Sequence, residues 1–495
     1  MPPMPAVSAG LVPVISVDRE ASAPLHRQVY AGFRDAILRG DLAAGQQVPS
    51  SRALASELEI SRFPVLDAYA QLLAEGYFES RVGAGTFVST ALPTQPAPTP
   101  PIADLPGTDR QTSRRSMLYP LYAPSPWRSG WGAFGVHQPA MDEFPFEIWS
   151  RLLARHSREL NLDAIVNVQP LGYPLGLVPF REAVCSYLRT SRAVRCDPSQ
   201  IMIVSGSQQA LDITARVLLD PGDAVWLEEP CYPLARALLL GSGCHPVPVP
   251  VDQEGLDVAA GRRMAPNARA AFVTPSHHYA LGVTMSASRR FQLLEWARQA
   301  SAWIVEDDYD SEYRYESMPI PSLQGLDPSG RVIYIGTFSK VLRPSLRLGY
   351  IVIPPDLVDR FASVRFAMDI FPSYLFQQVM TEFMRAGHFV RHIRRMRAMY
   401  KARRTALVDG LRAEFGDFFR IHGAEAGMHL TVTLPEGYND VEISTRAAKE
   451  RLCLWPLSQC YSTRPARQGF ILGFANTHED QMRAAVRHFK TIALS

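Results

Sequence analysis

The hydrophobic pattern of the first 90 residues predicts three helices followed by a small hairpin. Apolar residues recur at every fourth position within Pro24–Gly40, and a glycine at that point commonly ends a helix. A second helix is expected to open at Pro49-Ser50-Ser51, and Ser61 is the expected N-cap of a third, which ends at Gly76. Tyr77–Ser89 predicts two short strands around a turn. The residues expected to face inward are Leu25, Val29, Phe33, Ile37, Leu54, Leu58, Val65, Leu66, Tyr69, Leu72 and Leu73.

Three helices and a hairpin are typical of a winged helix-turn-helix domain, whose third helix enters the major groove of double-stranded DNA. Side chains at the starts of helices two and three and at the tip of the hairpin are then the expected DNA contacts. They are Arg52, Ser61, Arg62, Gly85 and Thr86. Charge adds no support, because residues 18–90 hold seven arginines, no lysine and nine acidic residues. On this pattern alone, a small helical domain without a DNA role stays an open alternative.

The stretch from Thr90 to about Arg115 is rich in proline, threonine and alanine and has no hydrophobic periodicity. Such a composition favours a semi-extended linker. We therefore predict a DNA-binding domain at residues 18–90, a linker at 91–128 and a larger effector domain at 129–495.

The larger domain alternates short apolar runs with helical patterns such as Ser207–Leu219 and Ser288–Ala300. This alternation predicts an α/β fold with a mostly parallel sheet covered by helices on both faces. In such sheets ligands bind at the carboxyl ends of the strands. The predicted strands are Ile201–Val204, Ala224–Leu227, Ala271–Val273, Trp303–Val305, Val332–Ile335 and Tyr350–Ile353.

Lys340 follows one of these buried strands, after a small-residue exit that contains Thr337 and Ser339. Burial disfavours a charged lysine, and a neutral lysine attacks aldehydes to form a Schiff base. The hydroxyl groups and Arg347 suit a phosphate, so the segment suggests pyridoxal 5'-phosphate (PLP). The alternative is a surface lysine, but only four of the 51 basic residues are lysines, so an arginine would be expected at a solvated position.

Other strand ends carry groups that suit the same cofactor. Ser207 and Gln208 begin a helix, where free N–H groups accept a phosphate. Tyr232 is placed to stack on a flat ring. A carboxylate of Glu306-Asp307-Asp308 is placed to hold a protonated pyridine nitrogen, with Tyr309 beside the ring oxygen. A metal-binding acidic cluster is the alternative, but no histidine lies at a suitable spacing near these acids to support it. His277-His278 also invites a metal, but adjacent side chains on a loop rarely converge on one ion, so no metal is expected.

Composition limits the function classes. A chain of 495 residues is expected to hold two to four domains, and its net charge of +3 says little about partners. Six cysteines without a CxxC pair indicate free thiols in a reducing cytosol. No signal peptide is recognised, and no apolar run approaches a membrane span of ~20 residues. We therefore expect a cytoplasmic protein without a membrane partner.

The first predicted domain resembles the GntR-type DNA-binding domain nearly end to end, from PLHRQVYAGFRDAILRGDL to YFESRVGAGTFVS. One departure is Phe63-Pro64, where family members usually carry Asn-Thr after Ser-Arg. The larger domain is similar to the fold-type I aminotransferases in the pieces FPFEIWSRLLARHSREL, GSQQALD, EDDYDSEYRY and SLRLGY. Joined to a GntR-type head, it resembles the MocR family of transcription regulators. The resemblance implies a PLP-dependent aminotransferase-like fold with a smaller α+β subdomain.

The resemblance also implies residue roles. Lys340 would form the internal aldimine, Asp307 would pair with the pyridine nitrogen, Tyr309 with the ring oxygen, and Tyr232 would stack on the ring. The phosphate would be held by Ser207, Gln208, Thr337 and Arg347. Tyr173 matches a residue that reaches the neighbouring subunit's phosphate, which implies a head-to-tail, domain-swapped homodimer.

Two departures near the site affect its chemistry. The aminotransferase arginine that grips a substrate carboxylate would fall where Ile471 stands, and Arg464 or Arg467 is the candidate replacement. Arg343 adds a positive charge close to Lys340, which would further favour a neutral amine if it points inward.

The sequence thus predicts a PLP-dependent DNA-binding transcription regulator that senses PLP, an amino acid or an amine through aldimine chemistry at Lys340, with paired DNA half-sites. A working aminotransferase that carries a DNA-binding head is the main alternative. A DNA-binding module whose body has lost PLP is a third.

Overall fold

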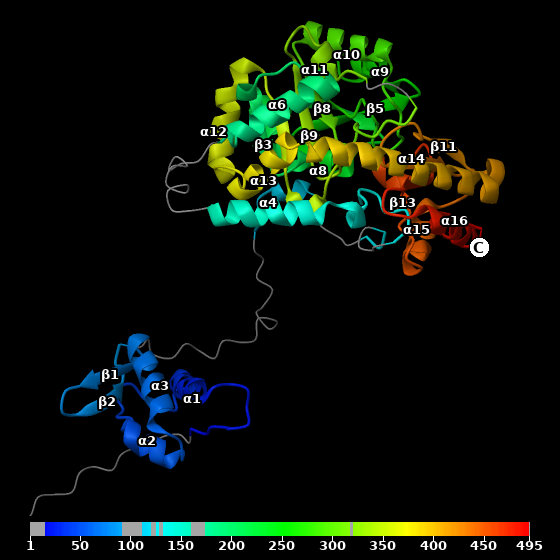
Figure 1. Cartoon of the computed structure of the whole chain (residues 1–495). Helices are drawn as coiled ribbons and strands as arrows, with labels where there is room; N and C mark the ends of the chain where they lie inside the picture. The colour runs from blue at the N-terminus through cyan, green and yellow to red at the C-terminus, as the bar shows by residue number, and fades with distance from the viewer. Residues whose placement is uncertain are drawn as a thin grey trace, which may run out of the picture. The chain divides into compact units, whose positions relative to one another are not determined.

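The computed structural model describes residues 15–91, 111–119, 125–127, 132–159, 174–316 and 320–494 (Figure 1). The chain divides into two compact units at residue 111, and each is described by itself: a head before that residue and a body after it. Within the described ranges, no helix is long and apolar enough to cross a membrane. Most of the predicted linker, and Tyr173, lie outside the described residues.

The head contains the predicted three helices and hairpin. Its elements are α1 (Leu25–Arg39), α2 (Ser51–Glu57), α3 (Arg62–Ala74), β1 (Phe78–Arg81) and β2 (Gly85–Val88), with the two strands antiparallel. Phe33, Tyr69 and Phe78 meet edge to face at the centre of the core, with ring centroids 5.2 to 5.5 Å apart. Three apolar rings from α1, α3 and β1 therefore hold the helices and the hairpin together.

Two details of α3 differ from the prediction. Leu66 and Leu73 are 41% and 38% exposed and do not belong to the core. The buried stripe is Val65, Ala68, Tyr69 and Leu72, which follows the i, i+3, i+4, i+7 spacing and leaves each of these two leucines one position outside it. Ser61 precedes the helix as expected, but its side chain makes no capping hydrogen bond.

The body is built on an eight-stranded sheet in the order β3-β10-β9-β8-β7-β4-β5-β6. From β9 to β5 neighbouring strands are parallel, and β10 runs antiparallel between β3 and β9. The mostly parallel sheet is therefore confirmed. The strands are β3 (Ile201–Val204), β4 (Ala224–Glu229), β5 (His245–Asp252), β6 (Gly255–Leu256), β7 (Ala270–Val273), β8 (Trp303–Asp308), β9 (Val332–Thr337) and β10 (Gly349–Val352).

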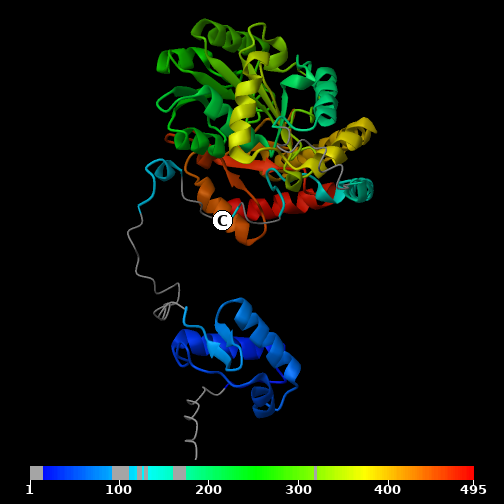
Figure 2. The same ribbon diagram turned by 90° about the vertical axis from the view of Figure 1, so that its left-hand side faces the viewer.

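Helices cover both faces of this sheet (Figures 1 and 2). Successive residues of β3 alternate between two cores, with Met202 and Val204 on the side of α7, α8 and α12, and Ile201 and Ile203 on the side of α4, α6 and α13. The helices are α4 (Phe146–Glu159), α6 (Val178–Arg192), α7 (Ser207–Leu218), α8 (Pro233–Gly241), α9 (Val258–Met264), α10 (Ala287–Ala300), α11 (Leu323–Leu326), α12 (Val358–Asp369) and α13 (Tyr374–Arg385).

A smaller α+β subdomain follows the long helix α14 (His388–Phe415). Its sheet has the order β11-β12-β14-β13 and is entirely antiparallel. One face, with Leu430, Val432 and Leu472, packs on the helices, whereas His429 and Ile471 lie on the other face. The remaining elements are β11 (Arg420–His422), β12 (His429–Thr433), α15 (Asp440–Lys449), β13 (Trp455–Pro456), β14 (Gly469–Gly473) and α16 (Glu479–Ala493).

Candidate functional site

The three consecutive acids at the end of β8 have different surroundings. Because successive side chains of a strand point to opposite faces, Asp307 lies on the face opposite to Glu306 and Asp308. Glu306 accepts backbone N–H groups of Leu323 and Gln324 at 2.9 and 3.0 Å. Asp308 is paired with the buried Arg192 at 2.8 Å. Asp307, on the other face, has a buried Oδ1 without a hydrogen-bond partner among the described residues. The Oδ1 of Asp308 also lacks a partner there, but its other oxygen is held by Arg192 and Tyr334, so Asp307 is the acid best placed for a ligand.

Lys340 lies close enough to Asp307 for the two charges to interact. Burial lowers the pKa of Lys340 to about 8, although Asp310 and Asp307 oppose the change. Burial also raises the pKa of Asp307 to about 7, an effect that Asp308 increases and Lys340 reduces. A lysine with this pKa is partly neutral near physiological pH, as attack on an aldehyde requires.

Tyr309 is fixed by the loop that follows β7. Its hydroxyl donates to the carbonyl of His277 at 2.9 Å and lies 3.3 Å from the Nδ1 of that ring. Asp310 contacts the same Nδ1 at 3.1 Å and accepts the backbone N–H of Met428 at 3.1 Å. The tyrosine is thus oriented by a buried histidine–aspartate pair that also ties the body to its small subdomain.

A cradle suited to a phosphate forms where α7 begins. Gly206 has φ +113° and ψ 173°, which places the start of α7 beside Arg347; a Cβ at this glycine would lie 3.4 Å from the guanidinium. Thr337 accepts the backbone N–H of Ser339 at 3.2 Å. The hydroxyl of Ser339 is buried and has no partner among the described residues. A helix N-terminus, an arginine and a free hydroxyl together fit a phosphate.

Unpartnered polar atoms around Asp307, Ser339 and Gln208 also indicate a ligand. The buried polar atoms that lack partners among the described residues include the Asp307 Oδ1, the Ser339 Oγ and the Gln208 Oε1. Buried polar groups are normally satisfied, so these atoms indicate a ligand with polar groups on opposite sides. PLP has a pyridine nitrogen at one side of its ring and a phosphate at another, and the residues fit it.

Capture of PLP by the cofactor-free protein is expected to accelerate as pH rises through about 8, because the neutral fraction of Lys340 increases there. Ionisation of Asp307 above about 7 acts in the same direction, because its carboxylate then favours a protonated pyridine. Stopped-flow absorbance over neutral and alkaline pH measures this. A midpoint near the ordinary lysine value of 10.5 would contradict it.

Replacing Gly206 by alanine is expected to weaken PLP binding by about tenfold or more. Its φ of +113° lies in a region that costs other residues about 1–3 kcal/mol, and relaxation of that strain moves the N–H groups at the start of α7. Titration of cofactor-free protein with PLP measures the loss. Gly222→Ala is the matched control, because this glycine also has a positive φ, +97°, but has open space around it. Equal losses in both variants would contradict the cradle.

An aromatic wall borders the site and consists of His137, Tyr232, Tyr279 and Trp455. His137 stacks on Tyr279, with centroids 5.3 Å apart and planes 15° from parallel. The centroid of its ring lies 6.3 Å from the ring centroid of Tyr232 and 6.0 Å from that of Trp455. Tyr279 lies 6.3 Å from Tyr309, which connects the wall to the predicted cofactor residues.

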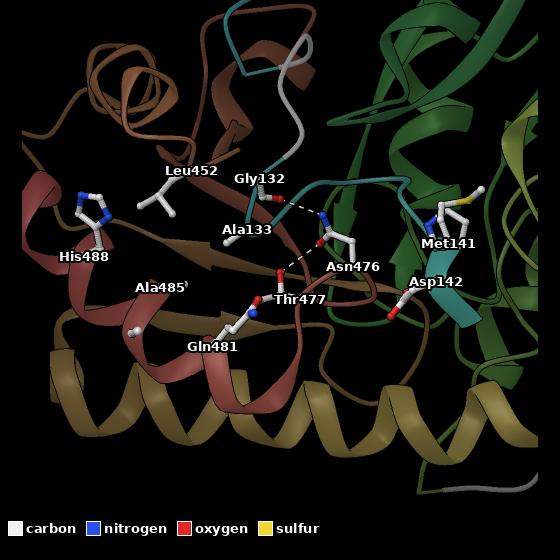
Figure 3. Close-up of a pocket in the computed structure, with 12 residues that line it drawn as sticks. Gly132, Ala133, Met141, Asp142, Leu452, Asn476, Thr477, Gln481, Ala485 and His488 are labelled. Atoms are coloured by element: carbon white, nitrogen blue, oxygen red, sulfur yellow. Dashed lines mark hydrogen bonds between the residues drawn. The ribbon is translucent and has the colours of Figure 1, made fainter. Parts of the chain in front are cut away.

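The segment that carries His137 is fastened to the small subdomain. Figure 3 shows Asn476 beside Gly132, whose carbonyl accepts its amide at 2.8 Å. The same amide donates to Gln138 at 2.8 Å. Cys453 donates its backbone N–H to Ala133 at 2.9 Å. These bonds hold the segment against the small subdomain, and Gly132 and Ala133 of the segment line the pocket drawn in Figure 3.

The adjacent histidines 277 and 278 diverge, as expected. His277 turns to Asp310, whereas the Nδ1 of His278 accepts the backbone N–H of Leu281 at 3.1 Å. A different group, His277, Asp310 and His429, brings three potential ligand atoms within 4.8 Å of one another. The absence of a metal stays a prediction.

The structure places the remaining predicted residues as follows. Arg464 and Arg467 are exposed and line a groove with Phe418 and His422 in the small subdomain. The guanidinium of Arg343 lies over the rings of Phe144 and Phe146, so the condition under which it would favour a neutral Lys340 is not met. The faces of these two aromatic rings attract the guanidinium of Arg343 through cation–π contacts.

Of the predicted DNA contacts on the head, Arg52, Ser61, Arg62 and Gly85 are exposed and Thr86 is half-buried. Arg52, Ser61 and Arg62 lie at the starts of α2 and α3, and the Nε of Arg62 donates to Ser51 at 3.1 Å. Phe63, at the start of α3, is 71% exposed. Gly85 begins β2 at the wing tip, where Gln47 braces the turn through the carbonyl of Ala84 at 2.8 Å. Thr86 follows in the same strand.

Sequence reasoning missed several residues that the fold brings to the site. They are Asp310, His137, His429 and Trp455. Asp310 stood inside the acidic stretch after β8, where its position one residue beyond Tyr309 was a usable signal. The other three come from the segment before α4 and from the second sheet, and no local pattern points to them.

Two family models match the chain. Residues 154–489 match the family described as aminotransferase class I and II, and residues 25–88 match the bacterial regulatory proteins of the gntR family.

Several curated relatives are similar over nearly the whole chain. The probable rhizopine catabolism regulatory protein MocR of Rhizobium meliloti is 40% identical over 485 residues, covering 97% of this chain and 96% of that protein. The HTH-type pyridoxine biosynthesis transcriptional regulator PdxR of Corynebacterium glutamicum is 29% identical over 483 residues, covering 95% and 96%.

Solved structures resemble the body. A kynurenine aminotransferase of Pyrococcus horikoshii, solved in complex with PMP, has a TM-score of 0.70 and 28% identity, covering 77% of this chain and 96% of that one. The α-aminoadipate aminotransferase of Thermus thermophilus, complexed with N-(5'-phosphopyridoxyl)-L-leucine, has a TM-score of 0.70 and 26% identity, covering 77% and 97%. The matched families, the full-length relatives and the site geometry agree, and the chain belongs to the MocR family of transcription regulators, which join a GntR-type DNA-binding domain to a PLP-binding aminotransferase fold.

Proposed function

We propose that PLP, an amino acid or an amine acts at Lys340 as the signal that changes DNA binding by the head. The observation that carries the proposal is the pairing of an unsatisfied Asp307 with a lysine of lowered pKa, in a chain that also bears a GntR-type domain. A ligand exerts such control only if it binds one arrangement of the protein better than the other.

PLP would be held here by Lys340, Asp307, Tyr309 and Arg347, and it would supply an electrophilic aldehyde carbon to the amine of Lys340 or of a free ligand, with water or the displaced amine as the leaving group. The chain's own residues do the rest. Asp307 would hold a proton on the ring nitrogen, and Tyr309, which the Asp310–His277 pair fixes in position, would present its hydroxyl. Arg347 and the first N–H groups of α7 would neutralise the phosphate.

A working aminotransferase is the second candidate, and the complete set of Lys340, Asp307 and Tyr309 favours it. Turnover also requires a group that orients the substrate carboxylate. Ile471 is fully buried at the position expected for that group, so we favour regulation with little or no turnover. Steady conversion of an amino donor and a keto acid by purified protein would support the second candidate.

We also propose a head-to-tail, domain-swapped homodimer in the cytoplasm. The motif around Tyr173 supports the dimer by resemblance, because its counterpart in the family reaches the phosphate of the neighbouring subunit. The six cysteines are buried and free, as suits a reducing compartment. Sedimentation analysis at twice the chain mass of 55.0 kDa is the expected result, and a monomer at working concentration would contradict it.

Arg62→Ala is expected to weaken DNA binding by about tenfold or more and to reduce its salt dependence by about one counterion, because the exposed guanidinium at the start of α3 is placed against the duplex. Fluorescence anisotropy with a selected DNA site at several salt concentrations measures both effects. Arg39→Ala is the matched control, because Arg39 ends α1 and pairs with Asp41 at 2.9 Å. Equal effects of the two substitutions would count against α3 as the recognition helix.

A further inference from the structure

The aromatic wall offers a ligand flat or polarisable surfaces rather than charge. His137, Tyr232 and Trp455 are half-buried, so part of each side chain stays exposed among the described residues. Tyr279 is buried behind them and stacks on His137. Rings and imidazoles of this kind bind the uncharged part of a ligand by packing and by neutral hydrogen bonds.

Ile471 forms the aliphatic base of this wall. Its cross-strand neighbours are Thr431 in β12 and Trp455 in β13. The side chain is 0% exposed and shares an apolar cluster with Tyr279 and Tyr309. Thr431 is itself bonded to the carbonyl of Ala280, which fixes the sheet against the loop that carries Tyr279. The position therefore has no room for a charged group without rebuilding the base.

The charges around Lys340 are mainly acidic. Asp310 and Asp307 both act on the lysine, and Arg347, which belongs to the phosphate cradle, is the cation that acts on it. Burial holds the pKa of His429 well below its usual value, so this imidazole stays neutral. An incoming ammonium group is attracted by such a field. A carboxylate would lose water and meet acids, which is costly unless a cation pairs with it.

The candidate arginines for such a pairing lie elsewhere on the described surface. Arg464 and Arg467 are exposed in the groove that Phe418 and His422 also line. That groove includes neither Lys340 nor a residue of the aromatic wall. Both guanidinium groups are therefore poorly placed to hold a carboxylate of a molecule whose nitrogen is at Lys340.

We infer that the effector is a primary amine without an α-carboxylate, whose uncharged remainder packs on His137, Tyr232 and Trp455 above Ile471. The inference rests on the proposed function, because it specifies which molecules exchange at Lys340. It separates amines from the amino acids that differ from them only by the carboxylate.

Matched pairs test the inference directly. The full-length protein loaded with PLP is titrated with ethanolamine against serine, and with 2-phenylethylamine against phenylalanine. Visible absorbance and the thermal unfolding midpoint are recorded at each concentration. In at least one pair, the amine is expected to perturb both signals at a concentration about tenfold or more lower than its amino acid requires. The reason is that the carboxylate of the amino acid would be desolvated in the site without a cation to pair with it.

The outcomes separate the two proposals. If the amino acid acts at equal or lower concentration in both pairs, or if neither member perturbs a protein that shows the cofactor band, the inference is overturned and PLP sensing stands. If the protein never shows a cofactor band after addition of PLP, the proposed function itself fails.

Substitution of the wall supplies a second test. Trp455→Ala is expected to raise the half-saturating amine concentration by about tenfold or more, because a packed aromatic ring is lost. Trp303→Ala is the control, because that half-buried tryptophan begins β8, at the strand end remote from Lys340. Equal shifts in the two variants would overturn the assignment of the wall.

Discussion

Lys340→Ala is expected to abolish covalent attachment of PLP and, with it, the visible absorbance band of the purified protein. The lysine is the half-buried amine beside Asp307, and its pKa of about 8 provides the neutral form that condenses with an aldehyde. Absorbance spectra before and after addition of PLP, followed by borohydride reduction and peptide mapping, measure the attachment.

Lys401→Ala is the matched control, because this lysine is exposed on α14. Its spectrum should equal that of the unsubstituted protein. A band of full intensity in Lys340→Ala, or a reduced cofactor mapped to another lysine, would contradict the assignment.

Phe33→Ala is expected to unfold the head and leave the body folded. Phe33 is 0% exposed and touches both Tyr69 and Phe78. Removal of such a ring costs about 3–5 kcal/mol, which is comparable to the total stability of about 4–11 kcal/mol expected for a domain of this size. The two compact units have separate cores, so DNA binding should vanish while the PLP band persists.

Leu38→Ala serves as the control, because this leucine of α1 is 39% exposed. Limited proteolysis and calorimetry distinguish the two variants: early cleavage within the head is expected only for Phe33→Ala. Loss of the cofactor band together with DNA binding would show that the two cores are not independent.

Local patterns predicted the elements that alternate regularly. Ile201–Val204 coincides with β3, and the other predicted strands differ from the observed ones by at most three residues at either end. β5 was missed because prolines occupy alternate positions of its sequence HPVPVPVD. These prolines are tolerated because, among the described residues, most of the strand pairs only with β4. The short strands of the second sheet carry too few residues for a period to appear.

Residues that follow neighbouring strands could be grouped from the sequence, whereas residues assembled by tertiary contacts could not. Asp307, Tyr309 and Lys340 come from neighbouring strands β8 and β9, so strand-end chemistry was sufficient to group them. His429 and Trp455 reach the site only because the second sheet packs against the loop after β7. Arg343 is close to Lys340 in sequence, but its side chain lies over Phe144, so proximity in sequence does not decide where a side chain points.

The most direct test of PLP-controlled DNA binding is the affinity of the full-length protein for a selected DNA site, measured with and without PLP in the unsubstituted protein and in Lys340→Ala. Coupling between two sites commonly amounts to about 1–3 kcal/mol, so a change of about 5- to 150-fold on addition of PLP is predicted for the unsubstituted protein. Lys340→Ala should bind the same DNA without that change. An affinity that is identical with and without PLP in the unsubstituted protein, or a response that survives in Lys340→Ala, would contradict control through Lys340.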